Sequence, residues 1–319
     1  MKIFLEFQEN SHLFYKIVIL TKIYEPIMKI PLFLLLISTI STSTSAQLAN
    51  QPRSRFIFLP EGLNFAPLRA NIQEPRIGVF KFLDAGEMKV DIGNTIDVFG
   101  FQIPAKGIIL STGIDFFAYA FTTGAQGLRL QIDAIDGFFG GNLSFSKESE
   151  RSKIQARLRI LHHSAHLVDG HYNLNTNTWL DNRGPIPFTK DFGELVLAHL
   201  ISKPFGNLRY YGGISYAILV RPTDLKRFEY LGGAEVYFDN IIDSVFNNPT
   251  NIYLAYNLSV NGMPKHIGSN QIQVGLKFGR WYSKGPSIYL AYYSGNHMFG
   301  EYFNKRLQTV GLGFTVDFF

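Results

Sequence analysis

The segment LQTVGLGFTVDFF, residues 307–319, decides the fold class of this chain. Its apolar residues alternate with small or polar ones, which is the period of two typical of a β-strand. In an outer-membrane β-barrel the apolar row of such a strand faces lipid, and the other row lines the interior. The chain ends on Phe319, an aromatic C-terminus of the kind that outer-membrane barrels present to the barrel-assembly machinery. We therefore expect that machinery as a partner.

Similar alternating segments recur through the preceding part of the chain. With the last one they number twelve, an even number, as a closed single-chain barrel with both termini on the periplasmic side requires. Closure leaves no backbone group unpaired in lipid. We predict an all-β fold, a transmembrane antiparallel up-and-down β-barrel of twelve strands within residues 75–319. The predicted strands are 75–84, 88–101, 107–121, 131–148, 151–167, 190–203, 207–221, 227–240, 250–262, 270–283, 286–298 and 307–319.

The N-terminal part has the pattern of an exported protein. Residues 28–46 read MKIPLFLLLISTISTSTSA, with a lysine, a short apolar core and small residues at the end. This is typical of a secretory signal peptide, and we expect translation from Met28 and cleavage after Ala46. Residues 1–27 are then an upstream extension, and residues 47–74 are predicted to be a periplasmic segment ahead of the barrel. No later apolar run reaches 18 residues, so no transmembrane helix is predicted. The alternating strand pattern then predicts that the exported protein lies in the outer membrane.

Composition narrows the function. The 319 residues include no cysteine, which excludes disulfides, thiolate metal sites and a cysteine nucleophile. The formal net charge is +5, without long runs of one sign, so we expect no nucleic-acid partner. The expected partners are the lipids of the outer membrane.

The stretch RLRILHHSAHLVDGH, residues 157–171, holds four of the eight histidines. Strand parity divides them, because residues two apart on a strand face the same side. The outward row continues through His162, Ser164 and His166, and His163 faces inward. His162 and His166 lie roughly 13 Å apart along an extended strand, too far to share one ion. No metal site is predicted.

Three stretches resemble a family of bacterial outer-membrane β-barrel proteins known as domain of unknown function 1207. They are FAPLRANIQEPR at 65–76, the histidine and serine stretch above, and AYYSGNHMFGEYF at 291–303 followed by GLGFTVDFF. The resemblance runs from about residue 60 to the end of the chain. It implies an outer-membrane barrel and no particular activity.

His162 and Ser164 also resemble the His-x-Ser pairs of outer-membrane phospholipase A, another twelve-stranded barrel, and of the outer-membrane lipid A deacylases. A serine becomes a nucleophile when an imidazole within about 3 Å removes its proton, and a third group must hold the other ring nitrogen. Asp191 is the candidate for that third group, with Asp169 and Glu194 as alternatives. No cofactor is expected unless the protein is a hydrolase, where a divalent cation such as Ca²⁺ could stabilise the oxyanion.

Three functions stay open at this point. The chain could be a structural or binding barrel without catalysis, which we favour from the sequence. It could be a lipid acyl-ester hydrolase that uses the catalytic residues His162, Ser164 and Asp191. It could also be a narrow anion-favouring channel. The basic interior row that suggests a channel could instead form salt bridges with Asp133 and Glu194; its members are Arg151, Lys153, Arg157 and Arg159.

Overall fold

The structure, a computed structural model, describes residues 53–319 apart from 126–128, 205, 246 and 263–264. The upstream extension and signal peptide predicted for residues 1–46 lie outside the described residues. Within the described part, no helix has both the length and the apolar character needed to cross a membrane.

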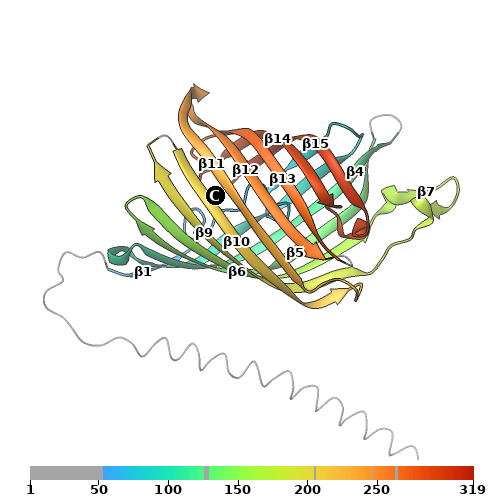
Figure 1. The fold of residues 1–319 in the computed structure, drawn as a ribbon, viewed down its shortest axis with the longest axis horizontal. Coiled ribbons are helices and arrows are strands. Elements are labelled where there is room, and N and C mark those ends of the chain that lie inside the picture. Colours follow the sequence, from blue (N-terminus) through green and yellow to red (C-terminus); the bar gives the residue numbers. More distant parts are fainter. Residues whose placement is uncertain (1–52, 126–128, 205, 246, 263–264) are drawn as a thin grey trace, which may run out of the picture. The chain divides into compact units, whose positions relative to one another are not determined.

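Twelve strands close into an antiparallel barrel (Figure 1). Each strand pairs with the next along the chain, and the last, β15, returns to pair with β2. The predicted all-β barrel of twelve strands is therefore confirmed. The strands are β2 Ile77–Phe82, β3 Met88–Ile103, β4 Ile108–Ala125, β5 Arg129–Ser149, β6 Ser152–Leu167, β9 Phe188–Lys203, β10 Gly206–Arg221, β11 Phe228–Val245, β12 Asn248–Gly262, β13 His266–Phe278, β14 Gly285–Asn296 and β15 Arg306–Asp317.

The two ends of the barrel differ in their connections. At one end, which we call the turn end, the strands are joined by tight turns and by η1 (Pro104–Lys106). At the other, the loop end, residues 168–187 form the longest connection of the described part. That connection contains η2 (Asp169–His171), the short hairpin β7 (Tyr172–Asn173) and β8 (Thr178–Trp179), and η3 (Leu180–Asn182). Residues 297–305 form a second loop there around η4 (Gly300–Tyr302).

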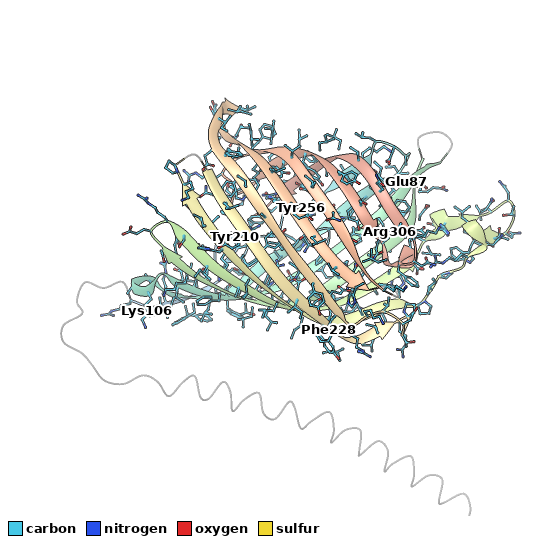
Figure 2. The ribbon with its side chains drawn as sticks, viewed as in Figure 1. Glu87, Lys106, Tyr210, Phe228, Tyr256 and Arg306 are labelled. Carbon is cyan, nitrogen blue, oxygen red and sulfur yellow. The ribbon has the colours of Figure 1, made fainter. Side chains whose placement is uncertain are left out.

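The outer face of the wall is apolar, whereas its inner face combines polar side chains with a cluster of buried aromatic residues that includes Phe82, Tyr119 and Phe138. On β15, Leu312 and Phe314 are exposed, whereas Thr309 and Thr315 are buried. Exposed side chains include Tyr210 and other aromatic residues on the outer surface (Figure 2). This distribution follows directly from the period-two alternation of the sequence.

The first wall strand is interrupted. The short strand β1 (Arg55–Phe58) pairs with the far end of β3, and β2 pairs with its beginning. The residues between β1 and β2, 59–76, leave the wall and enter the lumen, and we call them the luminal segment (blue in Figure 1). Leu68 is completely buried there, and Glu74 is only 1% exposed. The sequence predicts a periplasmic segment at residues 47–74; in the structure Arg55–Phe58 pair with the wall, and residues 59–74 lie in the lumen.

Interior arginines hold the luminal segment in place inside the barrel. Arg157 forms two hydrogen bonds with the Glu74 carboxylate, at 2.8 and 2.5 Å. Arg159 binds Glu194 at 2.6 Å and reaches the Gln73 carbonyl oxygen. The predicted salt-bridge network is thus confirmed for Glu194. It is wrong for Asp133, whose carboxylate accepts a hydrogen bond from Thr123.

A second set of contacts holds the other half of the luminal segment. Arg209 donates hydrogen bonds to the carbonyl oxygens of Ala66 and Pro67, at 3.0 and 2.9 Å. The Arg69 guanidinium binds Asp317 on the last strand at 2.5 Å. A buried backbone carbonyl needs a donor, so Arg209 lets this irregular chain cross the interior.

Candidate functional site

The predicted catalytic residues lie together on the outer face of the wall, on the neighbouring strands β6 and β9. The predicted parity of β6 is observed: Ile160 is 67% exposed, whereas Arg159 and His163 are almost fully buried. His162 and Ser164 therefore face outward and are partly exposed. The antiparallel register places Asp191 directly opposite His162.

His162 and Asp191 form a close pair. The His162 Nδ1 lies 2.6 Å from the Asp191 Oδ1, and the two side chains are 33% and 47% exposed. A carboxylate at Nδ1 favours the tautomer with its proton on that nitrogen, which leaves Nε2 as an acceptor. An exposed pair of this kind adds at most about 1 kcal/mol to stability. Its main consequence is that the imidazole ring is oriented and able to accept a proton.

Ser164 follows His162 on the same face, two residues along β6. No hydrogen bond joins Ser164 to His162 in the described part of the chain. Two residues of a strand span about 6.5–7 Å, so their side chains would need to turn toward each other to make the contact of about 3 Å that proton transfer needs. Such catalytic contacts are often long without substrate and tighten when it binds.

The structure separates Asp191 from the two alternative third members. Glu194 faces the interior and is bonded to Arg159. Asp169 begins η2, and no hydrogen bond connects it with His162 among the described residues. Of these three carboxylates, all within the described part of the chain, only that of Asp191 is in contact with the His162 ring.

Open space borders Ser164. Gly137 on β5 lies directly opposite Ser164, and no atom lies within 4 Å of the position where a Cβ would stand. The Phe139 ring lies beside the His162 ring, with 4.8 Å between the centroids. An apolar molecule lying against the wall could thus approach the serine from the side of β5.

The other histidines of the stretch have separate environments. The His163 Nε2 lies 2.7 Å from the Asp136 Oδ2, and Asp136 also accepts a hydrogen bond from the Gly300 backbone at the loop end. His171 lies 3.2 Å from the Tyr302 hydroxyl. The sequence did not predict that His163, through Asp136, and His171 are linked to the loop of residues 297–305. That loop lies more than a hundred residues away along the chain. Among the described residues, no three His, Cys, Asp or Glu side chains are grouped as metal ligands would be.

Comparisons with known proteins give no independent information on this site. No protein-family model matches the chain, and no curated protein matches it. The outward His162–Asp191 pair and its neighbour Ser164 are therefore interpreted from their contacts alone.

Proposed function

We propose that the chain is an integral outer-membrane β-barrel that hydrolyses acyl esters of lipids lying against its wall. In this proposal Ser164 is the nucleophile, His162 is the general base and Asp191 orients the ring. The observation that carries it is the 2.6 Å contact between His162 and Asp191 on the outward face. Membership of the domain of unknown function 1207 family is part of the same proposal and depends on the three sequence stretches.

The outer surface supports placement in a membrane. Ile160 and Leu197 are 67% and 58% exposed, and Phe139 is 54% exposed. Apolar surface in water costs about 25 cal/mol per Å², and lipid removes that cost. Eleven of the twelve wall strands have 12 or more residues, which exceeds the 9–11 residues or so that a tilted strand needs to span a bilayer. The exception is β2, which has 6 residues.

The chemistry would proceed in two halves. His162 Nε2 takes the hydroxyl proton while Ser164 Oγ bonds to the ester carbonyl carbon, and the imidazolium is stabilised by Asp191. The bond to the alcohol then breaks, and His162 returns the proton to the alcohol oxygen. Water repeats the sequence on the acyl-serine and releases a fatty acid. The oxyanion needs hydrogen-bond donors or a bound divalent cation such as Ca²⁺, and EDTA in the assay would distinguish these alternatives.

The test is fatty-acid release from phospholipid and lipid A vesicles by purified protein. We expect His162→Ala and Asp191→Asn to lower the rate by about 10²–10⁴-fold, the range of a lost general base or ring-orienting carboxylate. His166→Ala, which changes another rim histidine of the same strand, is the matched control and should act like wild type. Equal release by wild type and the His162 variant would reject this site.

Gly137→Val is expected to lower kcat/KM by at least about tenfold, since displacing a substrate by 1 Å costs that much or more. The Cβ of the new side chain would enter the open space opposite Ser164, where no atom lies within 4 Å of it. The thermal midpoint should stay at the wild-type value. Gly141→Val, on the same strand and face but nearer the turn end, is the control. A similar loss in both variants would show that access beside Ser164 is not the cause.

The interior offers the anion-channel hypothesis little support. Arg157 and Arg159, two of the four members of the basic row, are bound by Glu74 and Glu194 and so offer little free charge to an anion. The luminal segment also occupies the interior that the channel would need.

A further inference from the structure

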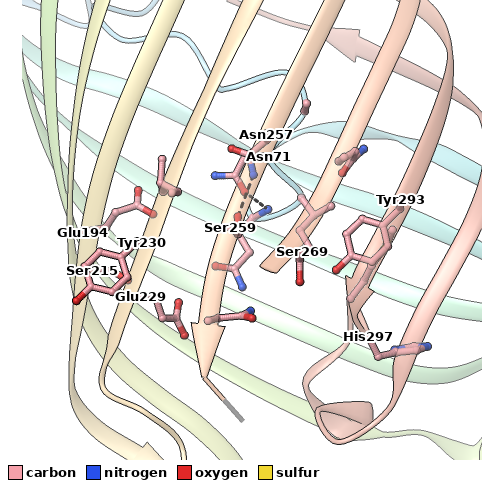
Figure 3. A pocket seen from close by; sticks show the side chains of 17 residues that line it. Asn71, Glu194, Ser215, Glu229, Tyr230, Asn257, Ser259, Ser269, Tyr293 and His297 are labelled. Carbon is pink, nitrogen blue, oxygen red and sulfur yellow. Dashed lines mark hydrogen bonds between the residues drawn. The ribbon is translucent and has the colours of Figure 1, made fainter. Parts of the chain in front are cut away.

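The strand β10 carries a β-bulge close to the candidate site. Below the bulge, Arg209 and Ser215 are buried on the inner side of the wall, and Ser215 lines the luminal cavity shown in Figure 3. Residues two apart on a regular strand face the same side, so strict alternation would carry this inward row on to residue 221. The pairing of β10 with β9 shifts between Ala217 and Leu219, however, and this shift marks the bulge.

The bulge turns Arg221 to the outer face of the wall. Ile218 and its neighbour Leu219 are both exposed, at 72% and 41%, whereas Val220 is only 3% exposed. The alternation is therefore reversed after the bulge, and Arg221 is exposed instead of facing the lumen. Bulges re-aim side chains in this way and are frequent next to active sites.

A second arginine holds the bulge in place. The guanidinium of Arg227 donates hydrogen bonds to the carbonyl oxygens of Ala217, at 2.9 Å, and of Ile218. A bulge disrupts the regular ladder of backbone hydrogen bonds, and these two bonds supply donors to its carbonyl groups. The outward direction of Arg221 is thus fixed by contacts of the strand itself.

The side chain of Arg221 keeps most of its donors for a ligand. Within the described part of the chain, its guanidinium donates to the carbonyl oxygen of the preceding residue, Val220, at 3.1 Å, and forms no ion pair with a carboxylate. A guanidinium has five N–H donors. Arg221 therefore presents a positive charge and open donors on the outer face.

The register of the sheet places Arg221 in the same row as Ser164. Ser164 lies opposite Thr189 on β9, and Thr189 lies opposite Arg221 on β10. Neighbouring strands are about 4.8 Å apart, so the backbones of Ser164 and Arg221 are separated by roughly 10 Å. Asp191 is on the strand between them. Its carboxylate would repel an anionic lipid, and the charge of Arg221 offsets that repulsion.

Building on the proposed hydrolysis at Ser164, we propose that Arg221 binds a phosphate of the substrate and thereby selects acyl esters that carry a phosphate nearby. A guanidinium matches the oxygens of a phosphate with two parallel hydrogen bonds. Glycerophospholipids and lipid A both carry a phosphate on a carbon adjacent or next but one to a carbon with an acyl ester. A lipid whose ester lies at Ser164 can therefore extend its phosphate toward Arg221, which acts as a determinant of specificity and takes no part in proton transfer.

The test compares lipids that share the acyl ester and differ in the phosphate. Phosphatidylglycerol and lipid A are the phosphate-bearing substrates, and diacylglycerol is the neutral comparator, all in the same zwitterionic detergent. We expect wild type to favour at least one phosphate-bearing lipid over diacylglycerol by about tenfold or more in kcat/KM, and Arg221→Gln to lower that ratio about tenfold, the effect of losing a charge-assisted hydrogen bond. A lowered ratio for one of the two lipids identifies which of them supplies the phosphate.

Arg306→Gln is the matched control. Arg306 is another exposed arginine at the loop end, on β15, which lies on the far side of the barrel from β6 and β10 (Figure 2). Its variant should keep the wild-type ratio. The inference is overturned if wild type shows no preference for a phosphate, if Arg221→Gln slows all three lipids equally or leaves the ratio as it was, or if Arg306→Gln lowers the ratio as much.

Binding without turnover separates this inference from the proposed function. The Kd values of phosphatidylglycerol, lipid A and diacylglycerol are measured by native mass spectrometry on the full chain carrying Ser164→Ala, with and without Arg221→Gln. Arg221→Gln should raise the Kd of the selected phosphate-bearing lipid about tenfold and leave that of diacylglycerol little changed. If wild type releases no fatty acid, the hydrolase proposal fails, and this selective rise still supports a phosphate site at Arg221. If wild type hydrolyses all three lipids without preference, hydrolysis at Ser164 stands and the role of Arg221 is rejected.

Discussion

Ser164→Ala is expected to slow fatty-acid release by at least about a thousandfold, since loss of a serine nucleophile leaves only the residual effects of binding. The substitution removes a single oxygen from a partly exposed side chain that takes part in no observed hydrogen bond. The stability of the barrel should therefore be unchanged. The rate is measured on phospholipid and lipid A vesicles, and unfolding in urea is followed on the same preparation.

Ser152→Ala is the control for this variant. Ser152 belongs to the same strand and the same outward row but lies at the turn end, 12 positions before Ser164. It should release fatty acid at the wild-type rate. A fluorophosphonate probe provides a second measurement, because it should label wild type at Ser164 and leave Ser164→Ala unlabelled. Labelling at another serine, with full activity in the Ser164 variant, would place the chemistry elsewhere.

Glu74→Ala is expected to lower the free energy of unfolding by about 3–5 kcal/mol, the usual cost of removing one partner of a buried ion pair. Its carboxylate is completely buried and binds Arg157. Burial raises the pKa of Glu74, but the charges of Arg157 and Arg159 outweigh burial and leave the pKa below its usual value. The carboxylate is thus ionised at neutral pH, and without it two buried guanidinium groups would share Glu194 alone.

The sign of the pH dependence follows from that lowered pKa. The contribution of Glu74 is present above the pKa of the unfolded chain and is lost as the pH falls through the folded value. The stability difference between wild type and Glu74→Ala should therefore shrink in acid. Glu61→Ala changes an exposed carboxylate of the same luminal segment and should cost less than about 0.5 kcal/mol. Equal losses in the two variants would show that the buried ion pair does not hold the segment.

The strands of the wall could be predicted from the sequence, whereas the luminal segment inside the barrel could not. Apolar residues face outward and small or polar residues face inward in turn, so the pattern of a stretch such as Val310 to Phe318 shows by itself which residues face outward. The luminal segment has no such period. Its Glu74 is buried because Arg157, 83 residues away, supplies the opposite charge. No pattern within FAPLRANIQEPR predicts that Arg157 is the partner.

The candidate site was predictable in part for the same reason. Parity along one strand is local, so the outward direction of His162 and Ser164 followed from their spacing. The choice of Asp191 over Asp169 and Glu194 depended on the register between β6 and β9, which a connection of 20 residues, 168–187, separates. Register across a connection of that length is set by strand pairing and not by any short pattern.

The luminal segment is joined to the wall at both ends, because β1 and β2 both pair with β3. This constrains the order in which the barrel folds. A terminal plug could enter a finished barrel, but a captive loop has to be inside when the ring closes. The ion pair that Arg69 of this loop forms with Asp317 joins residues 248 positions apart, so it can form only after the last strand has been added. Ring closure and binding of the loop are then a single late event in folding, and a chain truncated before β15 would complete neither.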